Sequence, residues 1–283
     1  MPRHMQKGLM HLLLPAVALG VVQGLTEFLP VSSSGHLVIA SHLLRFAEPS
    51  LLFDTLLHVG TLLPVLWLYR ADLCAILRGL RRLGAPARAW REDRGFRLMI
   101  CVVIGTVPTA LIGLTLGGLF TRLFASPTVV GVTFLVTGGI LMASRLSPQP
   151  LAQEEPEESH LSLSAARALW VGLAQGVAIT PGISRSGTTI TAALLLGIER
   201  TMAARLSFLL SIPAILGAVL LQLRGPLSST GWSVHLAGAL AAAVSGYLAL
   251  RWLVGLVRRG SFHRFAFYVW PLGLAVLAYT LFV

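Results

Sequence analysis

The chain has 283 residues, of which 55% are hydrophobic and 12% are charged, and its formal net charge is +11. A soluble globular chain carries about 25% charged residues, so this composition excludes a water-soluble protein. The basic residues concentrate in the links between apolar stretches, which indicates a signal for membrane orientation rather than nucleic-acid binding.

Segment 9–46 is the first predicted element, and it is apolar at both ends and polar in the middle. Pro30, with its Gly and Ser neighbours, would break a single long helix here. We therefore predict a re-entrant helix–loop–helix that dips into the membrane and returns to the same side. Segment 164–198 has the same pattern around Pro181, and we predict the same structure for it.

Six further segments are predicted to cross the membrane, because each is apolar over close to the roughly 20 residues that a spanning helix needs. They cover residues 51–69, 98–120, 128–146, 201–223, 233–257 and 265–283. The predicted fold is an all-α polytopic membrane protein with six transmembrane helices and two re-entrant segments, in one integral membrane domain, residues 1–283.

The link 70–97 indicates the orientation of these helices. It contains eight arginines against three acidic residues. By the positive-inside rule, this link is cytoplasmic. Counting spans from it also places the acidic link 147–163 inside and both chain termini outside.

The two polar segments are related to each other. A shift of 152 residues maps six small or polar residues onto identical ones without a gap. The first set is Gly20, Gln23, Gly24, Ser32, Ser34 and Gly35, and the second is Gly172, Gln175, Gly176, Ser184, Ser186 and Gly187. Because three predicted spans separate the copies, they enter the membrane from opposite sides. We predict an inverted repeat, about 9–146 and 164–283, with the working site between the halves near mid-membrane.

The first polar segment reads QGLTEFLPVSSSGH over residues 23–36. A carboxylate at membrane depth, here Glu27, is costly and usually pairs with a cation or serves function. Gln23 lies one turn earlier and can point at the same ligand or metal ion. The serines that follow lie where the second half-helix should begin, so they form either an anion site or a surface for close helix packing. His36 favours the anion site, because it adds a proton-transfer group for phosphate chemistry.

The second polar segment reads PGISRSGTT over residues 181–189. Arg185 lies among small and apolar residues, and a guanidinium is suited to bidentate contact with phosphate oxygens. The alternative is an arginine that snorkels to the membrane edge. We interpret the isolated polar residues His42, Asp54 and His58 as structural hydrogen-bond partners.

These motifs resemble the bacterial undecaprenyl-diphosphate phosphatases of the bacitracin-resistance type. Weaker matches are HVGTLLPV at 58–65 and VSGYLALRWL at 244–253. The resemblance implies hydrolysis of undecaprenyl diphosphate to undecaprenyl phosphate and inorganic phosphate, which recycles the lipid carrier for peptidoglycan synthesis. It also implies a divalent cation, Mg²⁺ or Ca²⁺, and a place in the bacterial inner membrane with the site open to the periplasm. Both termini would then be periplasmic.

Motifs and resemblance together predict the site. The predicted catalytic residues are Glu27, Ser33, His36 and Arg185, with Glu27 also a metal ligand. The predicted phosphate-binding residues are Gln23, Ser32, Ser34, Ser184, Ser186 and Thr189. We expect Ser33 to attack phosphorus, His36 to take its proton, and Glu27 to hold the imidazole or the cation. In the open alternative His36 itself is the nucleophile.

Two other functions stay open. An acid-phosphatase-type lipid phosphatase also has Ser-Gly-His and Ser-Arg patterns, but it expects a histidine soon after the arginine, and residues 186–194 contain none. A lipid-phosphate transporter or flippase would suit an inverted repeat with broken helices. The expected partners are the lipid substrate and membrane lipids, with no nucleic acid, and a homodimer is left open.

Overall fold

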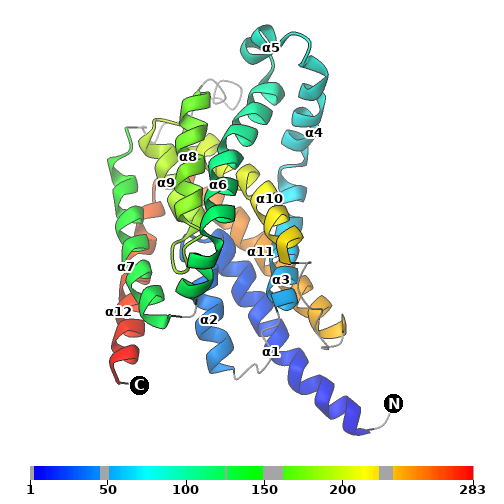
Figure 1. Cartoon of the computed structure of the whole chain (residues 1–283), viewed down its shortest axis with the longest axis vertical. Coiled ribbons are helices and arrows are strands. Elements are labelled where there is room, and N and C mark those ends of the chain that lie inside the picture. Colours follow the sequence, from blue (N-terminus) through cyan, green and yellow to red (C-terminus); the bar gives the residue numbers. More distant parts are fainter. Residues whose placement is uncertain (1–2, 45–50, 125, 149–161, 223–231, 283) are drawn as a thin grey trace.

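The computed structural model describes residues 3–44, 51–124, 126–148, 162–222 and 232–282. Every element within these ranges is a helix, and the helices form one elongated bundle (Figure 1). Five helices are long and apolar enough to cross a membrane, and a bent pair supplies a sixth span if it is counted as one. The prediction of an all-α, multi-pass membrane protein is therefore confirmed. Most of the acidic link 147–163 and the terminal residues 1 and 283 lie outside the described ranges.

The two polar segments are each a helix, a break and a second helix. Helix α1 (Arg3–Phe28) ends just before Pro30, and α2 (Ser33–Leu43) follows the break. In the second copy, α8 (Ala165–Val177) and α9 (Arg185–Leu195) flank the break. A shift of 152 residues carries the bounds of α2 onto those of α9, so the breaks occupy equivalent places in the two copies.

The two breaks differ in how the second helix begins. Ser32 has φ 66°, and it is the only non-glycine residue with positive φ in the described part of the chain. This conformation is strained for a serine. At the equivalent place Ser184 has φ −74°, and its hydroxyl caps α9 by accepting from the Gly187 N–H at 3.1 Å. No side chain of the described residues caps α2 in this way, so the start of α2 is open where that of α9 is closed.

The remaining long helices coincide with the predicted spans to within four residues. They are α3 (Leu51–Leu68), α6 (Arg94–Phe124), α7 (Pro127–Ala143), α10 (Arg200–Gln222), α11 (Trp232–Arg258) and α12 (Ala266–Phe282). Short 3₁₀ turns follow α7 and precede α12, at Ser144–Leu146 and Phe262–Phe265.

The Arg-rich link between α3 and α6 is itself helical. It contains α4 (Arg70–Gly79), a 3₁₀ turn at Leu80–Arg82 and α5 (Pro86–Glu92), which project from the upper end of the bundle in Figure 1. The chain bends by 76° between α3 and α4. Helix α4 therefore leaves the direction of the bundle at the point where the arginines begin.

Each broken segment packs against a helix from the other half of the chain. Helix α1 lies along α11, and α8 lies along α6 (Figure 1). At these two interfaces Gly20 faces Gly238 and Gly172 faces Gly105, so closely that a Cβ on Gly20 or Gly172 would collide with the opposite carbonyl oxygen. Small residues permit such close approach of helix backbones in membranes. The two halves are thus interlocked through equivalent glycines.

Candidate active site

Glu27, in the last turn of α1, is the centre of a polar cluster near both breaks, and it is only 8% exposed. Its Oε1 accepts a hydrogen bond from Arg185 Nη2 at 2.5 Å. Its Oε2 accepts from Ser33 Oγ at 2.6 Å and from Gln23 Nε2 at 3.1 Å. The structure thus brings together four of the predicted site residues, three from the first motif and Arg185 from the second.

Two buried polar atoms of this cluster have no hydrogen-bond partner among the described residues. They are Gln23 Oε1 and Arg185 Nη1. Leaving such atoms unpaired away from water is costly, which indicates that a ligand completes them. The guanidinium N–H can take an anionic oxygen, and the uncapped start of α2 offers backbone N–H groups to the same anion.

His36 does not lie where sequence reasoning placed it. Its Nδ1 is 2.8 Å from the Ser32 carbonyl oxygen, and its Nε2 is 2.9 Å from the Tyr268 hydroxyl of α12. The Ser33 hydroxyl is bonded to Glu27 instead. Helix side chains tilt toward the N-terminus, so the imidazole folds back onto the turn before it. The expected contacts of the His36 imidazole with Ser33 and Glu27 are therefore not formed in this structure, and the alternative that Glu27 holds the cation stays a prediction.

His58, on α3, is a site residue that sequence reasoning missed, because it was interpreted as structural. Its Nε2 lies 3.8 Å from Glu27 Oε2, and its Nδ1 lies 2.8 Å from the Asp54 carbonyl oxygen. Because a carbonyl only accepts, Nδ1 carries a proton in this contact, and Nε2 is the ring nitrogen that faces the carboxylate. The only signal in the sequence was the weak HVGTLLPV match, which begins at this histidine.

The hydroxyls of the second motif are engaged within the fold. Ser184 caps α9 at Gly187, and its Oγ lies 3.3 Å from Ser186 Oγ. Thr189 Oγ1 lies 2.6 Å from Ser207 Oγ on α10. Ser184, Ser186 and Thr189 are all buried. These three hydroxyls are therefore hydrogen-bonded within the fold and do not lie beside Glu27, where phosphate is expected to bind.

The two remaining predicted phosphate ligands, Ser32 and Ser34, lie at the start of α2, next to the break between α8 and α9. Ser34 Oγ is 3.2 Å from Ser32 Oγ and accepts from the Gly182 N–H at 3.5 Å. Gly182 belongs to the break between α8 and α9. Ser34 therefore joins the two polar segments, and its half-buried hydroxyl stays next to the open start of α2.

The cluster offers few ligands for a metal ion. Within the described ranges, no group of three or more His, Cys, Asp or Glu side chains could hold one. Mg²⁺ is commonly bound through one or two carboxylates together with substrate phosphates. The Glu27 carboxylate and the unpartnered Gln23 Oε1 are the atoms of this cluster that could hold a cation of that kind.

Comparison with known proteins gives consistent matches over most of the chain. The model of the family described as "Bacitracin resistance protein BacA" matches residues 16–275, which include both motifs. An undecaprenyl-diphosphatase of Desulfatibacillum aliphaticivorans is 44% identical over 275 residues, covering 93% of this chain and 97% of that protein. One from Desulfosudis oleivorans is 46% identical over 266 residues, covering 91% and 94%. One from Methanobrevibacter smithii is 42% identical over 273 residues, covering 93% and 96%.

Proposed function

We infer that this chain, which belongs to the family of the bacitracin resistance protein BacA, is an undecaprenyl-diphosphate phosphatase. It hydrolyses undecaprenyl diphosphate to undecaprenyl phosphate and inorganic phosphate. The lipid product is the carrier that peptidoglycan synthesis uses again, and the activity confers resistance to bacitracin.

One observation in the site carries this function. The Glu27 carboxylate is bonded both to a hydroxyl, on Ser33, and to an arginine, Arg185, that has a further N–H to offer. This arrangement combines a nucleophile, an acceptor for its proton and a donor for phosphate. A transporter needs the anion ligand, but it does not need a hydroxyl held on a carboxylate. The cluster therefore favours hydrolysis over transport alone.

The geometry suggests how the reaction proceeds. Arg185 Nη1 and the N–H groups at the start of α2 bind the diphosphate and stabilise its developing charge. Ser33 Oγ forms a bond to the terminal phosphorus as the bond to the bridging oxygen breaks, and undecaprenyl phosphate leaves. The proton of Ser33 passes to Glu27 Oε2 rather than to His36. Water then attacks the phosphoserine, releasing inorganic phosphate and restoring the hydroxyl with a proton returned through Glu27.

The two histidines have different places in this scheme. His58 Nε2 faces Glu27 Oε2 and can take the proton onward or steady the charge of the carboxylate. His36 is held between α2 and α12 by the Ser32 carbonyl and Tyr268. A phosphohistidine at His36 is the alternative to the phosphoserine, and it would require Nε2 to leave the Tyr268 hydroxyl.

A divalent cation, Mg²⁺ or Ca²⁺, is also proposed for the site. Glu27 and Gln23 Oε1 would hold it together with oxygens of the diphosphate. When bound, it would neutralise part of the phosphate charge and so favour attack by an oxygen nucleophile.

We further propose six spans and two re-entrant segments, arranged as an inverted repeat of about 9–146 and 164–283 within one domain. The matching bounds of α2 and α9 and the reciprocal packing of α1 on α11 and α8 on α6 support this arrangement. In a bacterial inner membrane, link 70–97 would then be cytoplasmic, while both termini and the opening of the site would be periplasmic. The four clustered side chains come from one chain, and a homodimer stays a prediction.

The test is phosphate release from undecaprenyl diphosphate by the purified protein in detergent, with and without a chelator. We expect one phosphate per substrate, loss of activity with chelator, and recovery with Mg²⁺ or Ca²⁺. Arg185→Gln is the matched inactive control. Movement of intact undecaprenyl diphosphate across vesicles, without phosphate release, would contradict the phosphatase assignment and favour a transporter.

A further inference from the structure

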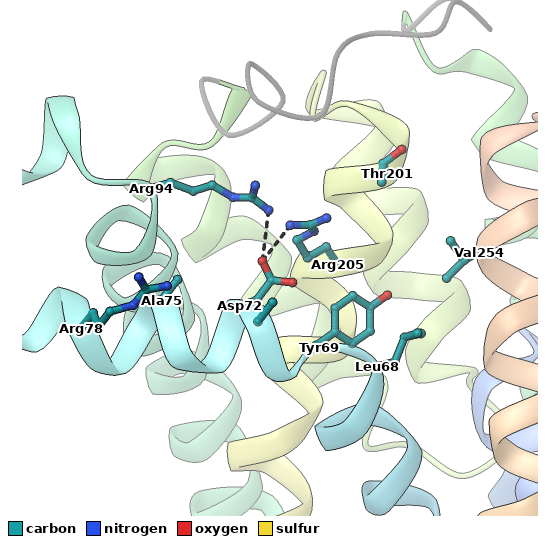
Figure 2. A pocket seen from close by; sticks show the side chains of 10 residues that line it. Leu68, Tyr69, Asp72, Ala75, Arg78, Arg94, Thr201, Arg205 and Val254 are labelled. Atoms are coloured by element: carbon teal, nitrogen blue, oxygen red, sulfur yellow. Dashed lines mark hydrogen bonds and ion pairs between the residues drawn. The ribbon is translucent and has the colours of Figure 1, made fainter.

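A cavity at the Arg-rich end of the bundle, named the second cavity because it lies apart from the candidate active site, has a volume of about 560 Å³ (Figure 2). Its lining comes from the ends of α3, α6, α10 and α11 and from α4. Tyr69 in this lining lies eleven residues beyond His58, which corresponds to about 16 Å along a helix. Between this cavity and the candidate active site, the centroid of the Phe208 ring lies 6.0 Å from that of Tyr69 and 5.7 Å from that of Phe28, the neighbour of Glu27. This second cavity is therefore separate from the candidate active site.

The second cavity has more positive charge than its own aspartate neutralises. Its ionisable lining is Arg78, Arg94 and Arg205 against Asp72, a net charge of +2. Asp72 Oδ1 accepts from Arg94 Nη2 at 3.0 Å and from Arg205 Nη1 at 2.7 Å, as Figure 2 shows. Each guanidinium has five N–H donors, so both arginines keep donors for another group.

Two further observations indicate that an anion completes this arrangement. Arg205 Nε is buried and has no hydrogen-bond partner among the described residues. The Arg78 side chain, at the edge of the cavity in Figure 2, donates only to the Cys74 carbonyl on its own helix, at 3.3 Å, and forms no ion pair within the described ranges. Guanidinium groups arranged in this way are suited to phosphate oxygens, which they bind through paired N–H donors.

The surroundings of the cavity resemble a membrane–water boundary. Trp67 and Trp252 are 63% and 57% exposed, and they lie one and two residues before the lining residues Leu68 and Val254. The Arg70 guanidinium lies 4.8 Å from the Trp67 ring. Exposed tryptophans next to arginines are typical of the level of lipid headgroups. The apolar lining residues beside the arginines can contact the first carbons of a lipid chain.

We propose that this cavity binds the phosphate headgroup of a membrane lipid, at the end of the bundle that carries the Arg-rich link. The excess charge and the free arginine donors select a phosphate. The apolar wall and the tryptophans select a phosphate attached to a lipid over a free ion. Arg78 contacts this phosphate from α4, and Arg205 contacts it from α10. This site is distinct from the phosphate site at Arg185.

The test is binding of dioctanoyl phosphatidic acid to the purified full chain in detergent. All proteins carry Arg185→Gln, which weakens phosphate binding at the active site. Arg78→Gln is expected to raise the Kd at least about tenfold, because a charged hydrogen bond to phosphate is lost. Arg78 is chosen because it has no ion pair in the described structure, whereas Arg205→Gln would disturb the pair with Asp72 as well. The matched control is Arg91→Gln, which removes the same charge from the exposed surface of α5 at another arginine without an ion pair in the described structure.

Three comparisons decide the outcome. Dioctanoylglycerol, which has the same tails without phosphate, should bind at least about tenfold more weakly than the phosphatidic acid. Inorganic phosphate should compete only at much higher concentration. Without Arg185→Gln, the Arg78→Gln protein should keep the parent phosphatase activity. Equal affinity of Arg78→Gln and Arg91→Gln, equal binding of dioctanoylglycerol, or equally tight binding of free phosphate would each overturn the proposal.

Discussion

Glu27 uses both carboxylate oxygens at once, one for Arg185 and one for Ser33 and Gln23. An ion pair between buried groups is costly to disturb, because removal of one partner leaves the other charge without compensation. The surrounding side chains can nevertheless be replaced one at a time, and each replacement removes a different contact of the carboxylate.

Replacing Arg185 with lysine keeps the charge but removes the planar fork. The single ammonium nitrogen lacks the two separate N–H groups of the planar fork, of which Nη2 holds Glu27 Oε1 and Nη1 is left for phosphate. We expect kcat/KM to fall more than tenfold, about 1.4 kcal/mol or more of transition-state stabilisation. Arg122→Lys, at the exposed end of α6, is the control. Near-parent turnover of Arg185→Lys would instead indicate that Arg185 has a structural role.

Ser33→Ala removes the hydroxyl that lies 2.6 Å from Glu27, and kcat should fall at least about a thousandfold. Ser34→Ala should lose much less, because that hydroxyl is not on the carboxylate. Enzyme quenched during turnover should carry acid-stable phosphoserine. Acid-labile phosphate on His36, with Ser33→Ala still active, would show that His36 and not Ser33 is the nucleophile, and the phosphatase function would still hold.

His58→Gln tests the residue that the sequence did not reveal. Loss of the imidazole that faces Glu27 should lower kcat by about a hundredfold, with little effect on KM. His42→Gln is the matched control, because His42 lies near Tyr279, at 3.4 Å, and not near Glu27. Equal kinetics of the two variants would return His58 to a structural role.

The difference between Glu27 and His58 shows what sequence could predict about the site. A carboxylate or an arginine inside an apolar stretch is conspicuous, so Glu27 and Arg185 could be selected without a structure. The part played by His58 depends on how α3 is rotated against α1, and no local pattern encodes that rotation. For the same reason, the sequence did not show that the hydroxyls of Ser184 and Thr189 are already hydrogen-bonded within the fold, because their partners depend on helix packing.

The helices themselves were predicted from apolar length, and their ends agree to within four residues because charged and proline-containing links limit each span. The helical structure of link 70–97 was not predicted, because hydropathy records only that this link is polar. The interlocking of α1 with α11 and of α8 with α6 depends on glycines whose partners lie far away in sequence.

These glycines give a prediction about stability. Gly20→Ala and Gly172→Ala should each destabilise the protein by about 1–3 kcal/mol, because a Cβ would force the paired helices apart. The readout is the thermal midpoint in detergent at one scan rate. Gly255→Ala, in α11, meets open space and should leave the midpoint unchanged or raise it, as alanine favours a helix. A common response of all three variants would show that the close contacts are not limiting.

The orientation of the whole molecule can be tested with its native cysteines. Cys74 is exposed on α4 within link 70–97, whereas Cys101 is buried in α6. A membrane-impermeant maleimide should label Cys74 only in inside-out vesicles. On a Cys74→Ser background, Val283→Cys should be labelled in intact spheroplasts. Labelling of Cys74 from outside would reverse the proposed orientation and the face on which the site opens.

The packing of α1 on α11 also sets an order of events while the protein is being made. Gly238, the residue that Gly20 faces, is synthesised 218 positions later, and Arg185 follows its partner Glu27 by 158 positions. At roughly 5–20 residues per second, α1 waits about 10–40 s for its helix partner to leave the ribosome. Until Arg185 is made, the Gln23–Glu27 turn has neither its arginine nor its covering helix, and for the rest of the interval it still lacks the helix. This turn of the nascent chain must therefore stay at the lipid surface or bound to the insertion machinery until the second half of the chain has been synthesised.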